Sequence, residues 1–238
     1  MKHKLIGVLG GIGTESTVGF YQNIVRYAQS KYDAVQDSDY PHMVIYNLPT
    51  SYTDKTGFKD LALVKYQLIN AVKKLELIGC DLIVICCNTS YHFYEDLQST
   101  VSTTIIDLIG ETKKSLLNKG YKNIGLLCSE SSIKLGVYQK KFKEMHLNIP
   151  NEKQQKVINR IIFDCMSGSY FNHTNTLKNM VTDMLNSGSE IVIIGCSELS
   201  LIVNRIKQNI KIFDTMDALS KLVVDYSLLK KDKIDFDY

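Results

Sequence analysis

Two cysteines stand at matching positions of an internal repeat. Gly79–Cys87 is a glycine, an apolar run and a terminal cysteine, and Gly188–Cys196 repeats that order with the same spacing. A thiolate can remove a proton from carbon, and a thiol can return one. Two thiols on opposite sides of a small amino acid are therefore what cofactor-free inversion of its α-carbon requires.

The repeat extends on both sides of the cysteines. Ile6–Leu9 is echoed by Ile124–Leu127, and Ile105–Asp107 is echoed by the segment that ends at Asp214. Halves related in this way usually face each other across a cleft. Equivalent strand ends would then place Cys87 and Cys196 on its opposite walls.

The ordinary interpretation of a cysteine in an apolar strand is a small buried hydrophobe. We keep that interpretation for Cys80, Cys86 and Cys165, and we expect Cys86 to point away from Cys87 because side chains alternate along a strand. The duplicated position and the polar residues that follow favour a functional role for the other pair.

Both candidate cysteines precede a helix-start pattern. Asn88 and Thr89 follow the first cysteine, and Ser197 and Glu198 follow the second. Backbone N–H groups at a helix N-terminus can bind a substrate carboxylate and stabilise charge that develops on it. Such a setting lowers a thiol pKa from about 8.5 toward neutrality, so we expect a partly ionised thiolate.

Other candidate binding residues lie in loops. The glycine-rich turn Gly10–Thr17 could by itself be only a tight turn, but its position at the same sheet edge as Cys87 favours close backbone approach of Gly11 and Ile12 to a ligand. Ser129 offers a hydroxyl at the matching place in the second half. Lys55 is a candidate partner for an acidic substrate side chain, with a solvated surface lysine as the alternative.

Composition narrows the function classes. The chain has 238 residues, 45% of them hydrophobic, and a net charge of +3 without a basic stripe, which argues against a nucleic-acid partner. The first residues lead directly into a strand pattern, which argues against a signal peptide and a membrane span, so we expect a cytoplasmic protein. Six cysteines should then stay reduced, and their spacing disfavours disulfides and a metal site.

Short apolar runs alternate with amphipathic stretches, which predicts an α/β fold with mainly parallel sheets. We expect two pseudo-twofold-related lobes with the active site in the cleft between them. The predicted limits are 1–100 plus 211–238 for the first lobe and 101–210 for the second. Strands are predicted at 4–9, 42–47, 81–86, 104–107, 123–127, 190–195 and 211–213. Helices are predicted at 15–30, 59–78, 91–99, 109–119, 132–145, 153–166, 173–187, 198–207 and 215–229.

Three motifs in order resemble the aspartate/glutamate racemase family, specifically its aspartate racemase branch. Gly10–Thr17 resembles the opening motif, Cys87-Asn88-Thr89 the first cysteine motif, and Gly195–Leu199 the second. The segment Ile158–Phe163 is similar to a stretch that precedes the second motif. The similarity covers nearly the whole chain.

The resemblance implies racemisation without pyridoxal phosphate or another cofactor, commonly in a homodimer, on a small and acidic amino acid. Cys87 and Cys196 would be the acid/base pair, while Asn88, Thr89 and Ser197 would hold the α-carboxylate. Lys55 stands where the family has a carboxylate-binding arginine, and it lacks the bidentate fork. Cys128 is a second departure, which could place a third thiol near the cleft.

Two other functions fit parts of the same pattern. Related decarboxylases and maleate isomerases use cysteine in similar clefts, but decarboxylation needs only one proton donor. A two-lobed binding protein could close on a ligand without reacting, but it gives no reason for matched thiols.

Overall fold

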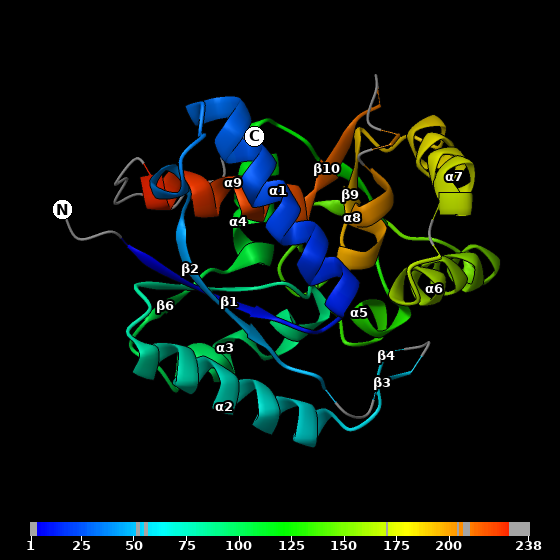
Figure 1. Ribbon diagram of the computed structural model, residues 1–238. Coiled ribbons are helices and arrows are strands. Elements are labelled where there is room, and N and C mark those ends of the chain that lie inside the picture. Colours follow the sequence, from blue (N-terminus) through cyan, green and yellow to red (C-terminus); the bar gives the residue numbers. More distant parts are fainter. Residues whose placement is uncertain are drawn as a thin grey trace.

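The computed structural model describes residues 4–50, 53–54, 57–169, 171–203, 205–206 and 210–228 (Figure 1). Two four-stranded parallel sheets carry helices on their faces, in the orders β2-β1-β5-β6 and β10-β9-β7-β8. Read from the other edge, the second order is β8-β7-β9-β10, which matches the first strand for strand. The predicted α/β fold with two related lobes is confirmed.

The first sheet is built around β1, whose apolar side chains are buried on both faces, as in other parallel sheets covered by helices. Val8 of β1 pairs with Ile45 of β2 on one side and Val84 of β5 on the other. The strands are β1 (Leu5–Gly10), β2 (His42–Asn47), β5 (Leu82–Ile85) and β6 (Thr104–Ile105). The helices of this half are α1 (Thr14–Tyr32), α2 (Leu61–Ile78) and α3 (Tyr94–Gln98), with 3-10 turns at Asp37–Asp39 and Thr89–Phe93.

The second sheet is built around β7 and β9 in the same way. Leu126 pairs with Ile193, and both side chains are fully buried. The strands are β7 (Asn123–Leu127), β8 (His146–Asn148), β9 (Ile191–Ile194) and β10 (Ile212–Asp214). The helices are α4 (Leu108–Asn118), α5 (Glu130–Lys134), α6 (Glu152–Met166), α7 (Thr174–Asn186), α8 (Ser197–Val203) and α9 (Thr215–Leu228), with a 3-10 turn at Phe171–His173.

Strand pairing differs from the predicted lobe limits at two strands. β6 pairs with β5 in the first sheet, although residues from 101 onward were assigned to the second lobe. β10 pairs with β9 in the second sheet, although residues from 211 onward were assigned to the first. The reason is that each strand is the last one added to its own sheet. β6 completes the first sheet before α4 carries the chain to the second, and β10 completes the second sheet before α9 carries the chain back to the first.

One predicted helix is shorter than expected, and two small elements were not predicted. The helix expected at 132–145 is the short α5 alone, because Gly136 turns the chain with a φ of 64°. The following turns lead into β8, an edge strand that was not predicted. The loop after β2 contains a small antiparallel hairpin of β3 (Thr53–Asp54) and β4 (Gly57–Phe58), which was also missed.

Helices α1 and α9 join the two halves. α1 leaves β1 of the first sheet and contacts α6 and α8 of the second half, while α9 leaves β10 and packs against α1 and β1 (Figure 1). One hydrophobic cluster consequently contains Ile6 of the first sheet, Ile193 of the second and Leu219 of α9. Among the described residues, the longest helices are too polar to cross a membrane.

Candidate active site

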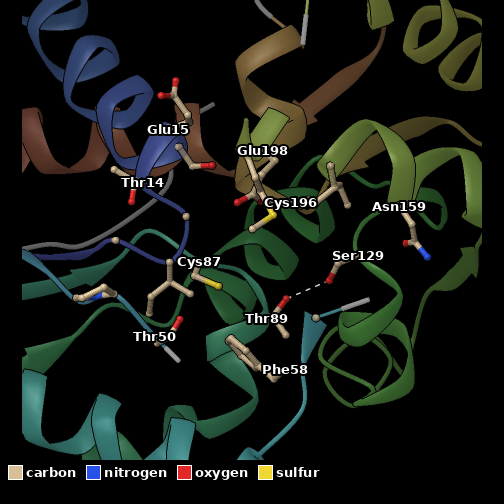
Figure 2. A pocket seen from close by; sticks show the side chains of 18 residues that line it. Thr14, Glu15, Thr50, Phe58, Cys87, Thr89, Ser129, Asn159, Cys196 and Glu198 are labelled. Carbon is tan, nitrogen blue, oxygen red and sulfur yellow. Dashed lines mark hydrogen bonds between the residues drawn. The ribbon is translucent and has the colours of Figure 1, made fainter. Parts of the chain in front are cut away.

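A cavity of about 320 Å³ opens where the carboxyl ends of both sheets meet (Figure 2). Cys87 follows β5 and Cys196 follows β9, and both thiols line the cavity. The predicted meeting of the two cysteines in one cleft therefore has a structural counterpart. The full lining consists of Gly11, Ile12, Gly13, Thr14, Glu15, Ser16, Pro49, Thr50, Gly57, Phe58, Cys87, Thr89, Ser129, Asn159, Ile162, Met166, Cys196 and Glu198.

Cys87 lies against the first backbone N–H groups of a 3-10 turn. The Ser90 hydroxyl lowers the pKa of Cys87, and the backbone N–H groups of Ser90 and Thr89 lower it further, as the helix-start pattern predicted. Burial works in the opposite direction and is the larger effect, and the Glu198 carboxylate adds to it. The net result raises the pKa of Cys87 to about 11, so this thiol is protonated at neutral pH in the free protein.

Cys196 has a carboxylate as its direct neighbour. Its Sγ donates to Oε2 of Glu198 at 3.0 Å, and the Ser197 hydroxyl donates to the same oxygen at 3.1 Å. Burial and the Glu198 charge raise the pKa of Cys196 well above its ordinary value, although the N–H groups of Glu198 and Leu199 lower it. The prediction of thiol pKa values near neutrality is therefore wrong for the free protein, because desolvation exceeds the stabilisation by the N–H groups.

The glycine-rich turn after β1 forms another wall. The Thr17 hydroxyl accepts from the Gly11 N–H at 2.9 Å and donates to the Gly13 carbonyl at 3.0 Å, which closes the turn. A Cβ on Gly11 would lie 2.5 Å from the backbone nitrogen of Leu48. A Cβ on Gly13 would lie 2.8 Å from Oε1 of Glu198. Gly11 thus needs glycine for space, whereas a Cβ on Gly13 would displace only the end of the Glu198 side chain. The contact at Gly13 brings the start of α1 directly against the carboxylate beside Cys196.

Three hydroxyl groups meet across the two halves at the floor of the cavity. Thr89 Oγ1 lies 3.1 Å from Ser129 Oγ and 2.8 Å from Ser132 Oγ. Ser129 also caps α5, because its hydroxyl accepts from the Ser132 N–H at 3.1 Å. Figure 2 shows the contact between Thr89 and Ser129 below Cys196 and beside Cys87. The first half and the second half each supply part of this polar surface.

Asn88 lies behind the cavity wall. Its Oδ1 accepts from the Tyr138 hydroxyl at 2.7 Å and from the Thr215 hydroxyl at 3.1 Å. Its Nδ2 is buried and has no hydrogen-bond partner among the described residues. Tyr138 in turn packs over Gly195, where a Cβ would lie 2.6 Å from the hydroxyl oxygen. Asn88 thus connects the loop of the first cysteine to the segment before the second.

The predicted site residues fall into three groups. Gly11, Ile12, Thr89, Ser129 and Glu198 line the cavity together with the two cysteines. Asn88 and Ser197 lie next to lining residues but are buried and outside the lining itself. Lys55 lies outside the described residues. Cys128, which could place a third thiol near the cleft, directly precedes the lining residue Ser129, but it is fully buried and is not itself part of the lining.

The sequence analysis missed the part of the cavity wall that comes from β4 and α6. Phe58 comes from the unpredicted hairpin, and Asn159, Ile162 and Met166 come from one face of α6. The spacing of the last three residues at intervals of three to four is the signal that could have identified them. Among the described residues, no group of three His, Cys, Asp or Glu side chains is arranged to hold a metal ion.

The fold and the paired thiols define the class of protein, and sequence comparison agrees. Residues 9–223 match the Asp/Glu/Hydantoin racemase family. The chain therefore belongs to that family, and the predicted resemblance is confirmed. It is an amino-acid racemase by class.

Individual relatives support the same conclusion. The broad specificity amino-acid racemase RacX of Bacillus subtilis is 31% identical over 222 residues, which cover 92% of this chain and 96% of RacX. The aspartate racemase of Picrophilus torridus has a similar structure, with a TM-score of 0.80, 24% identity and 94% of each chain covered. An aspartate racemase homologue from Pyrococcus horikoshii gives a TM-score of 0.78 at 25% identity, with 94% of this chain and 99% of that chain covered.

Proposed function

We propose that the chain interconverts the enantiomers of a small free amino acid by moving the α-proton between Cys87 and Cys196. The observation that carries the proposal is the presence of both thiols in one cavity, each at the carboxyl end of an equivalent strand. One thiolate removes the α-proton from one face, and the opposite thiol returns a proton to the other face. The reverse reaction exchanges the two roles.

Glu198 supplies the missing base for this cycle. A thiol with a strongly raised pKa is a poor base at neutral pH, but the proton of Cys196 already points at Oε2 of Glu198. When the positively charged α-ammonium group of the substrate enters, it favours the thiolate, and the proton moves from sulfur to the carboxylate. Cys87 remains protonated and is ready to donate.

The α-carboxylate of the substrate binds at the polar floor in this proposal. Thr89 and Ser129 present hydroxyl groups there, and the turn of Gly11 and Ile12 approaches from the side. Asn88 and Ser197 support these groups from behind. Charge that develops on the carboxylate as the α-proton leaves is stabilised by these fixed dipoles.

The remaining expectations stay proposals. No cofactor is required by a two-thiol cycle, and a cytoplasmic homodimer is expected from the sequence and the family resemblance. An acidic substrate was expected partly from Lys55, which lies outside the described residues. The relatives include an aspartate racemase and a broad-specificity amino-acid racemase, so they leave the side chain of the substrate open.

The test is proton exchange in deuterated water. L- and D-amino acids are incubated with the wild type, Cys87→Ser and Cys196→Ser, and α-deuterium is followed by NMR. We expect exchange and inversion in the wild type and loss of inversion in both variants, because serine is a far weaker acid than a thiol. Cys80→Ser is the matched control, since Cys80 is buried beside Gly7 and away from the cavity.

Two outcomes would contradict the proposal. Full racemase activity in either active-site variant would remove that thiol from the cycle. Ligand binding without any exchange in the wild type would favour the binding protein that the sequence left open.

A further inference from the structure

We propose that Tyr138 is a positioning residue that sets the separation between the Cys87 and Cys196 thiols. This inference rests on the proposed racemase function and names a side chain behind the cavity wall on which the reaction depends. The Tyr138 hydroxyl binds the residue that follows the first cysteine, and its ring packs on the residue that precedes the second.

The hydroxyl group of Tyr138 holds the loop of the first cysteine. It donates to Oδ1 of Asn88 at 2.7 Å, and Asn88 directly follows Cys87. Thr215 Oγ1 lies 3.1 Å from the same oxygen, but it also lies 3.0 Å from the carbonyl oxygen of Ile194. The single hydrogen of a threonine hydroxyl serves one of these acceptors at a time. Tyr138 is therefore the constant donor to the Asn88 amide.

The ring of Tyr138 holds the segment before the second cysteine. Gly195 directly precedes Cys196, and a Cβ on Gly195 would lie 2.6 Å from the Tyr138 hydroxyl oxygen, 2.8 Å from Cζ and 2.9 Å from Cε2. The edge of the phenol ring thus lies directly against the backbone of Gly195. One side chain consequently contacts a neighbour of each thiol.

Tyr138 is itself held in place. Its side chain is fully buried, and its ring packs against that of Phe142 with the centroids 5.8 Å apart. Its carbonyl oxygen accepts from the N–H groups of Phe142 at 2.9 Å and Lys141 at 3.0 Å. Burial raises the pKa of Tyr138 well above its ordinary value, so the hydroxyl stays protonated and keeps its role as a donor. The phenol group can therefore act as a fixed spacer between the two cysteine segments.

A fixed separation of the thiols decides what happens to the α-proton. After one thiolate has removed it, the opposite thiol must lie within reach to donate a proton to the other face. If that donor is displaced, the first sulfur exchanges its hydrogen with solvent and returns a deuteron to the original face. The ratio of exchange without inversion to inversion therefore reports the relative placement of the thiols. Partial unfolding lowers both rates equally and leaves the ratio unchanged.

The experiment measures this ratio in deuterated water. The enantiomers of aspartate, glutamate, alanine and lysine are supplied one at a time to the wild type, and the amino acid that is inverted fastest is used for the variants. Tyr138→Phe removes the hydroxyl and retains the ring. We expect the ratio to rise by about tenfold or more for the enantiomer that Cys196 deprotonates, because Cys87 is then the displaced donor. That enantiomer is the one that Cys87→Ser still exchanges.

Gly195→Ala tests the ring contact from the opposite side. The added Cβ displaces the segment before Cys196, so we expect a rise of about tenfold or more for the other enantiomer, the one that Cys87 deprotonates. Thr112→Val is the matched control, because it also removes a buried hydroxyl, one that donates to the Leu108 carbonyl at 2.7 Å within α4. Its ratio should equal that of the wild type.

The outcomes separate the two proposals. An unchanged ratio in Tyr138→Phe or in Gly195→Ala would overturn the spacer role and leave the racemase function intact, as would an equal rise in Thr112→Val. Absence of exchange in the wild type with all four amino acids would overturn the racemase function itself, and the spacer role with it.

Discussion

At the residue scale, the two thiols differ in their surroundings. Both are buried and protonated in the free protein, but Cys196 touches a carboxylate, while Cys87 faces backbone N–H groups. The thiol beside the carboxylate can lose its proton to Glu198 within the site. This asymmetry predicts that the activity of Cys196 depends on a neighbouring base, Glu198, and that the activity of Cys87 does not.

Glu198→Gln tests this dependence. We expect kcat/KM at pH 7 to fall by about 10²-fold or more, the usual range for loss of a general base. In the wild type the proton moves from sulfur to carboxylate without leaving the site, so kcat/KM should change little between pH 7 and 9. In the variant the thiol must ionise to solvent, so activity should rise by about tenfold per pH unit below the thiol pKa.

The expected rise of activity with pH in Glu198→Gln follows from the direction of the Cys196 pKa shift. Cys196 has a raised pKa, and loss of the Glu198 charge lowers it, so alkaline pH restores the thiolate in the variant. Profiles of kcat/KM against pH for the wild type and the variant provide the measurement. A deficit that stays constant from pH 7 to 10 would contradict the role of Glu198 as proton acceptor.

At the element scale, the sequence repeat predicted the parts that the two halves share. The glycine, apolar run and cysteine correctly located β5 and β9, because a buried strand and its carboxyl end have a strong sequence pattern. The hairpin of β3 and β4 and the edge strand β8 were missed, since none of these short strands contains two adjacent apolar side chains. The wall that β4 and α6 form depends on contacts between distant segments, which periodicity alone cannot provide. The direction of the thiol pKa shift was missed for the same reason, because burial is a property of the assembled fold.

The start of α1 offers a test at the element scale. Gly13→Ala would place a Cβ 2.8 Å from Oε1 of Glu198 and so force the carboxylate to move. The φ of Gly13 is −81°, which alanine adopts without strain, so the fold should be retained. We expect kcat to fall by about tenfold or more, since small displacements of catalytic groups have large effects.

The measurement combines steady-state kinetics with thermal unfolding. Val18→Ala, at an exposed position of the same helix, serves as the control and should leave kcat unchanged. Normal kcat in Gly13→Ala would show that the contact between the turn and Glu198 does not position the carboxylate.

At the scale of the whole molecule, the site exists because two similar sheets face each other. α1 and α9 cross between the halves, and a buried hydrogen bond joins Tyr138 to Asn88 at 2.7 Å. Hydroxyl groups from both halves meet below the cavity. These contacts hold two equivalent strand ends in a fixed relation, which delivers one cysteine to each side of a small substrate.

The most direct test of the two-cysteine cycle is the isotope content of product and remaining substrate early in the reaction in deuterated water. A single enantiomer is supplied, and the α-hydrogen of each enantiomer is measured by mass spectrometry after separation. Two separate thiols predict a product that carries deuterium at the α-carbon from the first turnover, while the remaining substrate keeps its hydrogen. Early product that retains the original hydrogen would show that a single group moves the proton between both faces, and it would contradict the paired roles of Cys87 and Cys196.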